Sequence, residues 1–252
     1  FIWILFFGLF VYWSFAGSGE SNWENNVRKE LYQSVDFGTG VGGTATVAVL
    51  PVQGVIDGSD LEENRGKSEN TVVAVKRCLR QLKKQKDLRA LVLFIDSPGG
   101  SAVASDNIYE LLERWQEETG IRVVAYFSSV AASGGYYIAQ AADEIVADPQ
   151  SITGSIGVIM TTYNLAELAN KVGVKVEVYK SEPHKDMGTP FRDATGDERV
   201  ILQNFINESY ERFVAVVTKG RAGRLDSAQV RLLADGRIYS GRQAAHLRLV
   251  DG

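Results

Sequence analysis

The sequence predicts an α/β fold in which helices flank a largely parallel sheet, and three observations support this prediction. Apolar runs of strand length alternate with segments whose apolar residues recur at helical spacing between residues 44 and 252. The run "RALVLFID" at 89–96 is continuously apolar, as in strands that are buried on both faces of a sheet. Residues 1–17 carry no charge, so a separate N-terminal segment precedes the folded domain.

The expected elements follow one another in a regular order. The segment "TATVAVLPVQGVI" at 44–56 predicts a first strand or strand pair, and a charged loop then leads to a helix at about 70–86. After strand 89–96 we expect a helix at 104–118, a strand at 121–129, a helix at 132–142, the short strand "EIVAD", the glycine-punctuated turn "ITGSIGVIM" into another strand, the helix "NLAELANKVG", the strand "VKVEVYKS", a long helix at about 197–219, a shorter helix at 226–234, and the closing segment "GRIYSGRQAAHLRLVDG".

Composition sets limits on the function. The chain has 252 residues, of which 45% are hydrophobic, which is enough for one large domain or two small ones. Its formal charge of −4 gives no general attraction to nucleic acid, so we expect no nucleic-acid partner. Cys78 is the only cysteine, which excludes an intrachain disulfide. Because it lies on the apolar stripe of helix 70–86, a structural thiol is favoured over a nucleophile.

The N-terminal segment "FIWILFFGLFVYWSFAG" predicts a transmembrane anchor at 1–17. It is slightly shorter than the roughly 20 apolar residues of a spanning helix, and the chain begins at Phe1, so we expect residues to be missing upstream. Tyr12 and Trp13 suit the aromatic belt of a membrane interface. The alternatives are a cleaved signal peptide, which the small residues Ser14 and Ala16 favour, and a buried core helix.

Residues 18–43, which include "GTGVGG", are polar and glycine-rich and predict a tether between the anchor and the domain at 44–252. Glu20 and Glu24 follow the apolar run, and the first cation is Arg28. Because cytoplasmic flanks are enriched in lysine and arginine, we expect a single-pass protein of the plasma (inner) membrane whose folded domain lies outside the cytoplasm.

A glycine turn, "DSPGGS", follows strand 89–96 and opens the next helix. Two adjacent glycines can expose backbone N–H groups at a helix start, where negative charge is favoured, so this turn suits an oxyanion hole or a phosphate cradle. The patterns GxxxxGK[ST] and GxGxxG are both absent from it, so nucleotide binding is unsupported. The alternative is a purely structural turn.

Ser133 lies at the next junction between a strand and a helix, within "SSVAASGGYY". Gly135 matches half of the GxSxG pattern of a nucleophilic serine, but Ala131 stands where that pattern has glycine. A serine at a helix start is also a common N-cap, which is the alternative interpretation.

A nucleophilic serine needs a base, and the chain has two histidines. His246 lies near the C-terminus in a helical stretch, and His184 precedes Lys185 in the loop "KSEPHKDMGTPFRD". A lysine can act as the base when burial lowers its pKa from about 10.4, because a dry site penalises the ammonium form. Ser–Lys dyads work in this way. The alternative for Lys185 is a solvated loop lysine.

Four segments together, "DSPGGS", "SSVAASGGYYIAQAADEIVAD", "SITGSIGVI" and "HKDMGTPFRDATGDER", resemble the S49 family of signal peptide peptidases, the SppA type. The resemblance covers roughly residues 44–252 and includes the closing segment. It implies a fold like that of Clp protease and crotonase, and a peptidase domain that continues beyond the C-terminal "LVDG". Arg248 stands where the family commonly has glycine.

The resemblance also implies roles for individual residues. Ser133 would be the nucleophile, Lys185 the general base, and Ser155 the hydroxyl that orients the lysine amine. Gly100 would donate an oxyanion-hole N–H, and by geometry Gly134, which follows the nucleophile, is the natural second donor.

The implied activity is that of a membrane-anchored serine endopeptidase that degrades remnant signal peptides and other apolar peptides, without a metal or cofactor. The implied partners are peptide substrates, the lipid bilayer and further copies of the chain, in a homo-oligomer whose active sites are shared between subunits. Ser133 and Lys185 would then come from different protomers. Two alternatives stay open: a crotonase-like acyl-CoA enzyme, which would need acidic residues near the acyl group and an adenine pocket, and an inactive membrane scaffold.

Overall fold

The computed structural model describes residues 33–39, 43–58 and 70–252. The anchor predicted at 1–17 lies outside the described residues. Within the predicted tether, residues 33–39 form strand β1 (Gln33–Thr39), which pairs antiparallel with β2 (Gly43–Gln53). In the part of the chain that the structure describes, no helix combines the length and the apolar character needed to cross a bilayer.

A seven-stranded sheet forms the centre of the molecule, with the order β1-β2-β3-β4-β6-β7 and with β5 also paired to β4. The pairs around β3 and β4 are parallel, whereas the outer pairs β1–β2 and β6–β7 are antiparallel. The remaining strands are β3 (Leu88–Ser97), β4 (Arg122–Ala132), β5 (Glu144–Ala147), β6 (Ile152–Gly154) and β7 (Ile238–Ser240). The predicted α/β class with a mostly parallel sheet and flanking helices is confirmed.

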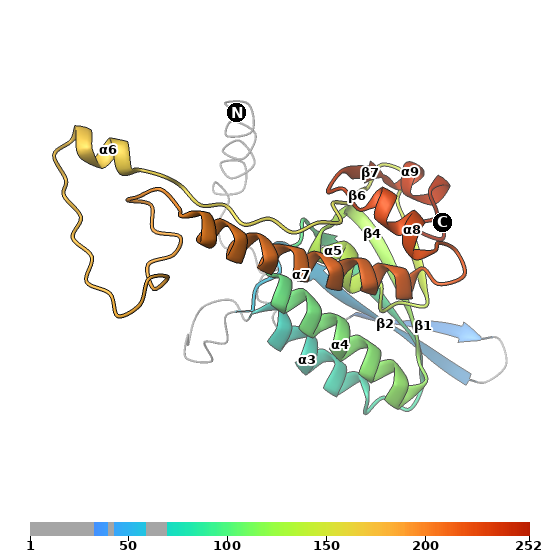
Figure 1. Cartoon of the computed structure of the whole chain (residues 1–252). Helices are drawn as coiled ribbons and strands as arrows, with labels where there is room; N and C mark the ends of the chain where they lie inside the picture. Colours follow the sequence, from blue (N-terminus) through green and yellow to red (C-terminus); the bar gives the residue numbers. More distant parts are fainter. Residues whose placement is uncertain (1–32, 40–42, 59–69) are drawn as a thin grey trace, which may run out of the picture.

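Helices α3 and α4 lie side by side along the sheet (Figure 1). Their contact includes a hydrogen bond in which the Trp115 indole donates to the Leu79 carbonyl at 3.0 Å. Cys78 is buried on the inner face of α3, in agreement with a structural thiol. The helices are α3 (Thr71–Leu82), α4 (Ala102–Thr119), α5 (Gly134–Ala139), α6 (Ala166–Lys171), α7 (Gly196–Gly220), α8 (Ser227–Leu233) and α9 (Gly241–His246).

After β6 the chain leaves the sheet, makes a long excursion that contains α6, and returns along α7 (Figure 1). We call residues 158–195 the arm. The strand predicted at 174–181 is wrong, because these residues form no strand in the structure. Their alternating valines satisfied the pattern of a strand, but a strand also needs a neighbour with which to form backbone hydrogen bonds.

Helix α7 joins the arm to the rest of the described domain, the sheet with its flanking helices, which we call the body. In its C-terminal half Phe213, Val214, Val216 and Val217 are buried, whereas near its N-terminus only Glu198 is buried. The Arg212 guanidinium on α7 also binds Asp106 of α4 at 2.9 Å. The body therefore holds α7 by its second half, and its first half extends toward the arm.

Candidate active site

Ser133 occupies an unusual backbone conformation between β4 and α5, with φ 51° and ψ −119°. Conformations of this kind typically cost a residue other than glycine about 1–3 kcal/mol and persist only where the surroundings impose them. Here the Ser133 N–H donates to the Gly154 carbonyl and the Ser133 carbonyl accepts from the Tyr137 N–H, both at 2.9 Å. Ser133 stands at the N-cap position of α5, but its side chain makes no capping hydrogen bond, so the side chain has no capping role.

The glycines around Ser133 allow two turns to pack directly against each other. A Cβ atom on Gly99 would lie 2.6 Å from the Gly134 nitrogen and 2.8 Å from the Ser133 Cβ. A Cβ atom on Gly135 would lie 2.9 Å from the Ser97 carbonyl oxygen. Non-bonded atoms do not approach this closely, so the small residues of "SPGG" and "SGG" are required for the contact between the turns.

Two backbone N–H groups are available beside Ser133. Ile56 donates to the Gly99 carbonyl at 2.9 Å and accepts from the Ser101 N–H at 2.8 Å, so Gly100, which lies between these two bonds, directs its own N–H away from Ile56. Gly134 is the first residue of α5 and has no acceptor within the helix. A Cβ atom on Gly134 would lie 3.3 Å from the Gly100 nitrogen, which places the two residues next to each other.

A cavity of about 450 Å³ opens beside the serine, and both Ser133 and Ser155 line it. Ser155 also has a positive φ, 51°, and its N–H donates to the Arg237 carbonyl at 2.8 Å. The other lining residues are mostly apolar or small: Ile156, Gly157, Val158, Ile159, Ile206, Asn207, Tyr210, Ala234, Asp235 and Gly236. The cavity therefore suits an apolar side chain presented next to a nucleophile.

The ionisable groups of this cavity do not supply a good base. Asp235 binds the Arg237 Nε through both carboxylate oxygens at 2.8 Å, and hydrogen bonds from Arg237 lower the pKa of Asp235, which makes it a weaker base. The Tyr210 hydroxyl donates to the Ala234 carbonyl at 2.8 Å. The described residues that line the cavity include no lysine or histidine.

Lys185 lies away from Ser133 in this chain. It is exposed on a turn of the arm, where its N–H donates to the Glu182 carbonyl at 3.2 Å, and it does not line the cavity. His184 is exposed on the same turn, and His246 is exposed at the end of α9. One chain thus brings together four of the five predicted site residues and leaves Lys185 apart.

Comparison with known proteins shows the family to which the chain belongs. The model of peptidase family S49 matches residues 116–252, and the Clp protease model matches residues 61–151. The chain belongs to peptidase family S49. The resemblance to SppA-type S49 peptidases is thus confirmed, and the sheet with its flanking helices is consistent with a Clp-protease-like fold.

Several relatives of this S49 chain carry protease names. The chain is 44% identical over 184 residues to the "Putative protease slr0021" of Synechocystis, covering 73% of this chain and 65% of that protein. It is 35% identical over 212 residues to "Protease 4" of Haemophilus influenzae, covering 81% of this chain and 32% of the relative. It is 33% identical over 174 residues to "Serine protease SPPA, chloroplastic" of Arabidopsis thaliana, covering 69% of this chain and 25% of that protein. The aligned part spans about half to two thirds of the length of the first curated relatives.

The structure adds residues to this S49 site that sequence reasoning missed. The buried Ser97 hydroxyl accepts a hydrogen bond from the Gly99 N–H at 3.1 Å and so shapes the glycine turn. The sequence contained a signal for this role of Ser97, because a serine side chain that accepts a hydrogen bond from the N–H two residues later is a common turn motif. Asn207 and Tyr210 of α7 also line the cavity. No signal in the sequence identified them, since the helical pattern does not tell which residues of α7 reach the serine.

Proposed function

We propose that this chain is a membrane-anchored serine endopeptidase that uses Ser133 and Lys185 as a dyad to degrade remnant signal peptides and other apolar peptides. The observation that carries the proposal is the conformation of Ser133, which places a serine beside two available N–H groups at the edge of a mostly apolar cavity. Membership of peptidase family S49 supports the same reaction class.

In this mechanism neutral Lys185 removes the hydroxyl proton of Ser133 as the serine oxygen attacks a peptide carbonyl carbon. The Gly100 and Gly134 N–H groups stabilise the oxyanion that forms, and the loss of one such donor typically lowers the rate about 10²–10³-fold. Lys185 then gives its proton to the leaving amine as the peptide bond breaks, and water hydrolyses the acyl-serine. Ser155, which lines the same cavity as Ser133, would orient the lysine amine.

We propose further that the lysine comes from a neighbouring subunit of a homo-oligomer. Two observations support this: Lys185 lies outside the cavity of its own chain, and the arm that carries it exposes large apolar side chains. Tyr179 is 92% exposed, Ile159 86%, Tyr163 73% and Val172 66%. Apolar groups gathered on one projecting segment typically mark an interaction surface.

The substrate class follows from the cavity and the N-terminal segment. The mostly apolar lining favours apolar peptide side chains, and remnant signal peptides supply these in a membrane. The apolar residues 1–17 would hold the domain at the bilayer, on the extracytoplasmic side of the plasma membrane.

A fluorophosphonate probe tests the dyad. We expect the wild-type protein to be labelled and Ser133→Ala and Lys185→Ala to lose labelling. Ser129→Ala, an exposed serine on β4, and Lys175→Ala, an exposed lysine of the arm, serve as matched controls that keep it. Labelling that survives Ser133→Ala would reject the nucleophile, and a His184→Ala variant that loses activity while Lys185→Ala keeps it would reject the base.

Mixing subunits tests the shared site. If each active site takes Ser133 from one subunit and Lys185 from another, an oligomer assembled from both inactive variants contains some sites with both wild-type residues. We expect peptide hydrolysis to return when unfolded Ser133→Ala and Lys185→Ala chains are refolded together. No recovery in mixed oligomers of confirmed composition would contradict a shared site.

A further inference from the structure

The turn that carries Lys185 is joined to the first turn of α7 by four charged residues, which we call the arm network: Lys180, Asp186, Arg192 and Glu198. The Asp186 carboxylate binds the Lys180 amine at 2.7 Å and the Arg192 Nη2 at 2.8 Å. Arg192 also binds both Glu198 oxygens, at 2.8 Å through Nη1 and 2.5 Å through Nη2. One guanidinium thus connects the residue that follows the proposed base with the helix.

Glu198 fixes the other end of the network. Its side chain is 1% exposed, and it forms a capping box with Thr195, in which the Thr195 N–H donates to Glu198 Oε2 at 2.9 Å and the Glu198 N–H donates to the Thr195 hydroxyl at 3.2 Å. Lys180 donates in addition to the Pro183 carbonyl at 2.9 Å. The turn of Lys185 is therefore held against α7 by buried or bidentate contacts.

The network also balances charge next to the proposed base. An unpaired Asp186 carboxylate would favour the ammonium form of neighbouring Lys185 and so oppose its action as a base. Lys180 and Arg192 compensate this carboxylate together with Glu198, so the four residues carry no net charge. The other titratable groups of this turn and its flanks are Glu177, Tyr179, Glu182, His184, Asp193 and Asp197.

Both carboxylates of the network stay ionised over a wide pH range. Hydrogen bonds from Arg192 and then Lys180 hold the pKa of Asp186 far below its usual range. Hydrogen bonds from Arg192 and from the Thr195 N–H lower the pKa of Glu198 to about 2. The charge balance is therefore constant at the pH values where a lysine base would titrate.

We propose that Arg192 and Lys180 are positioning residues that fix the Lys185 turn and cancel the Asp186 charge, which lets Lys185 lose its proton. This inference rests on the proposed role of Lys185 as general base. It assigns to the arm network a function in setting the pH at which the peptidase becomes active, in addition to its contribution to the fold.

The test is the pH dependence of fluorophosphonate labelling by the full chain. Removing a cation, in Arg192→Gln or Lys180→Gln, should move the midpoint of the labelling rate to higher pH. Removing an anion, in Glu198→Gln, should move it to lower pH, and glutamine can keep the capping box. For a unit charge at a separation of one Debye length, roughly 8 Å, a water-like dielectric predicts a shift of about 0.4 pH unit, which shrinks at high salt.

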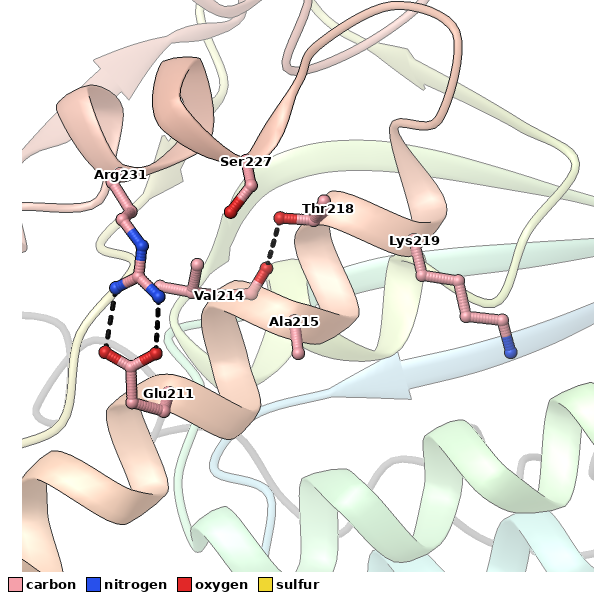
Figure 2. Close-up of a pocket in the computed structure, with 7 residues that line it drawn as sticks. All are labelled: Glu211, Val214, Ala215, Thr218, Lys219, Ser227 and Arg231. Atoms are coloured by element: carbon pink, nitrogen blue, oxygen red, sulfur yellow. Dashed lines mark hydrogen bonds and ion pairs between the residues drawn. The ribbon is translucent and has the colours of Figure 1, made fainter.

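A control ion pair joins the same helix, α7, to α8. Figure 2 shows Arg231 of α8 binding both carboxylate oxygens of Glu211 on α7, at 2.8 and 2.5 Å, in a contact that includes no residue of the arm. Arg231→Gln removes a paired arginine–glutamate contact at an exposed site and should leave the midpoint unchanged. Arg192→Lys keeps the charge but loses the paired geometry, so it should keep the midpoint and lower the maximal rate.

The outcome separates this inference from the proposed function. If Lys185→Ala keeps its labelling, the proposed base is wrong. If Lys185→Ala loses labelling but the cation and anion variants shift together or not at all, only the charge-balancing role is wrong. Should Glu198→Gln fail to fold, Lys180→Gln decides the sign, because the Lys180 side chain is 33% exposed and its loss leaves the capping box intact.

Discussion

Alanine at position 100 is expected to remove one donor of the proposed oxyanion hole. The added Cβ would lie 2.1 Å from the Ile56 carbonyl oxygen and 2.8 Å from the Ile56 nitrogen, whereas real Cβ contacts are rarely shorter than 3.0 Å. Both partners are backbone atoms, so no side-chain rotation can relieve the contact. The glycine turn must therefore move away from Ile56.

That movement should lower both the stability of the fold and the catalytic rate. It stretches the hydrogen bonds from Ile56 to Gly99, 2.9 Å, and from Ser101 to Ile56, 2.8 Å, each of which contributes about 0.5–1.5 kcal/mol to stability. It also moves the Gly100 N–H away from its position beside Ser133. Loss of one oxyanion donor should lower kcat about 10²–10³-fold with little change in KM.

The assay compares peptide hydrolysis with thermal unfolding in the same preparation. Gly120→Ala is the control, since Gly120 has a positive φ of 66° at the end of α4 and nothing within 4 Å of an added Cβ. We expect this control to lose about 1 kcal/mol of stability and to keep its kcat. A folded Gly100→Ala protein with kcat within threefold of wild type would refute the assignment of this N–H.

Three further predictions concern stability. Asp251→Asn should lower the free energy of unfolding by about 3 kcal/mol, because it removes the carboxylate charge that accepts two hydrogen bonds of 2.9 Å from the buried Arg221 guanidinium. Chemical denaturation measures this change, and a loss under about 1 kcal/mol would contradict the prediction. Arg248→Gly should raise the free energy of unfolding by up to about 1 kcal/mol, because Arg248 has a φ of 61°, which glycine adopts without strain. A lower free energy of unfolding would show that the Arg248 side chain stabilises the fold by more than its backbone conformation costs. The pKa values of Asp186 and Glu198 are lowered, so their contribution to stability is complete above about pH 5, where both groups are also ionised in the unfolded chain, and it is lost as pH falls toward 2. Pepsin should therefore cleave the arm faster at about pH 2 than at about pH 4, relative to an unstructured peptide of the same sequence. An equal ratio at the two pH values would contradict this.

Local chemistry was predictable where the sequence constrains the backbone. The adjacent glycines of "DSPGGS" predicted exposed backbone N–H groups at a helix start, and the structure places the Gly100 nitrogen next to Gly134 and beside Ser133. The sequence left open whether Ser133 was an N-cap or a nucleophile. The absence of a capping hydrogen bond from its side chain decided against a capping role, and the bond from the Ser133 N–H to Gly154, which no local pattern contains, accompanies its unusual φ and ψ angles.

The arm was less predictable because its pattern depends on partners that are distant or absent. Alternating valines at 174–178 predict a strand, but the described residues offer these valines no neighbouring strand. The motif around Lys185 likewise predicted a base without predicting where the loop would lie. A periodic pattern of apolar residues indicates which face of a segment is expected to be buried, but it does not indicate which chain buries that face.

Helix α7 has 25 residues and connects the anchored half at Phe213–Val217 with the arm. Each residue of an α-helix turns the chain by about 100° and advances it by about 1.5 Å. One residue inserted between the two halves would rotate the whole arm about the helix axis and point Lys185 elsewhere, whereas seven residues would nearly restore its direction while displacing it by about 10 Å. The length of this helix thus sets the direction and position of the arm, and we expect the helix to tolerate substitution far better than insertion.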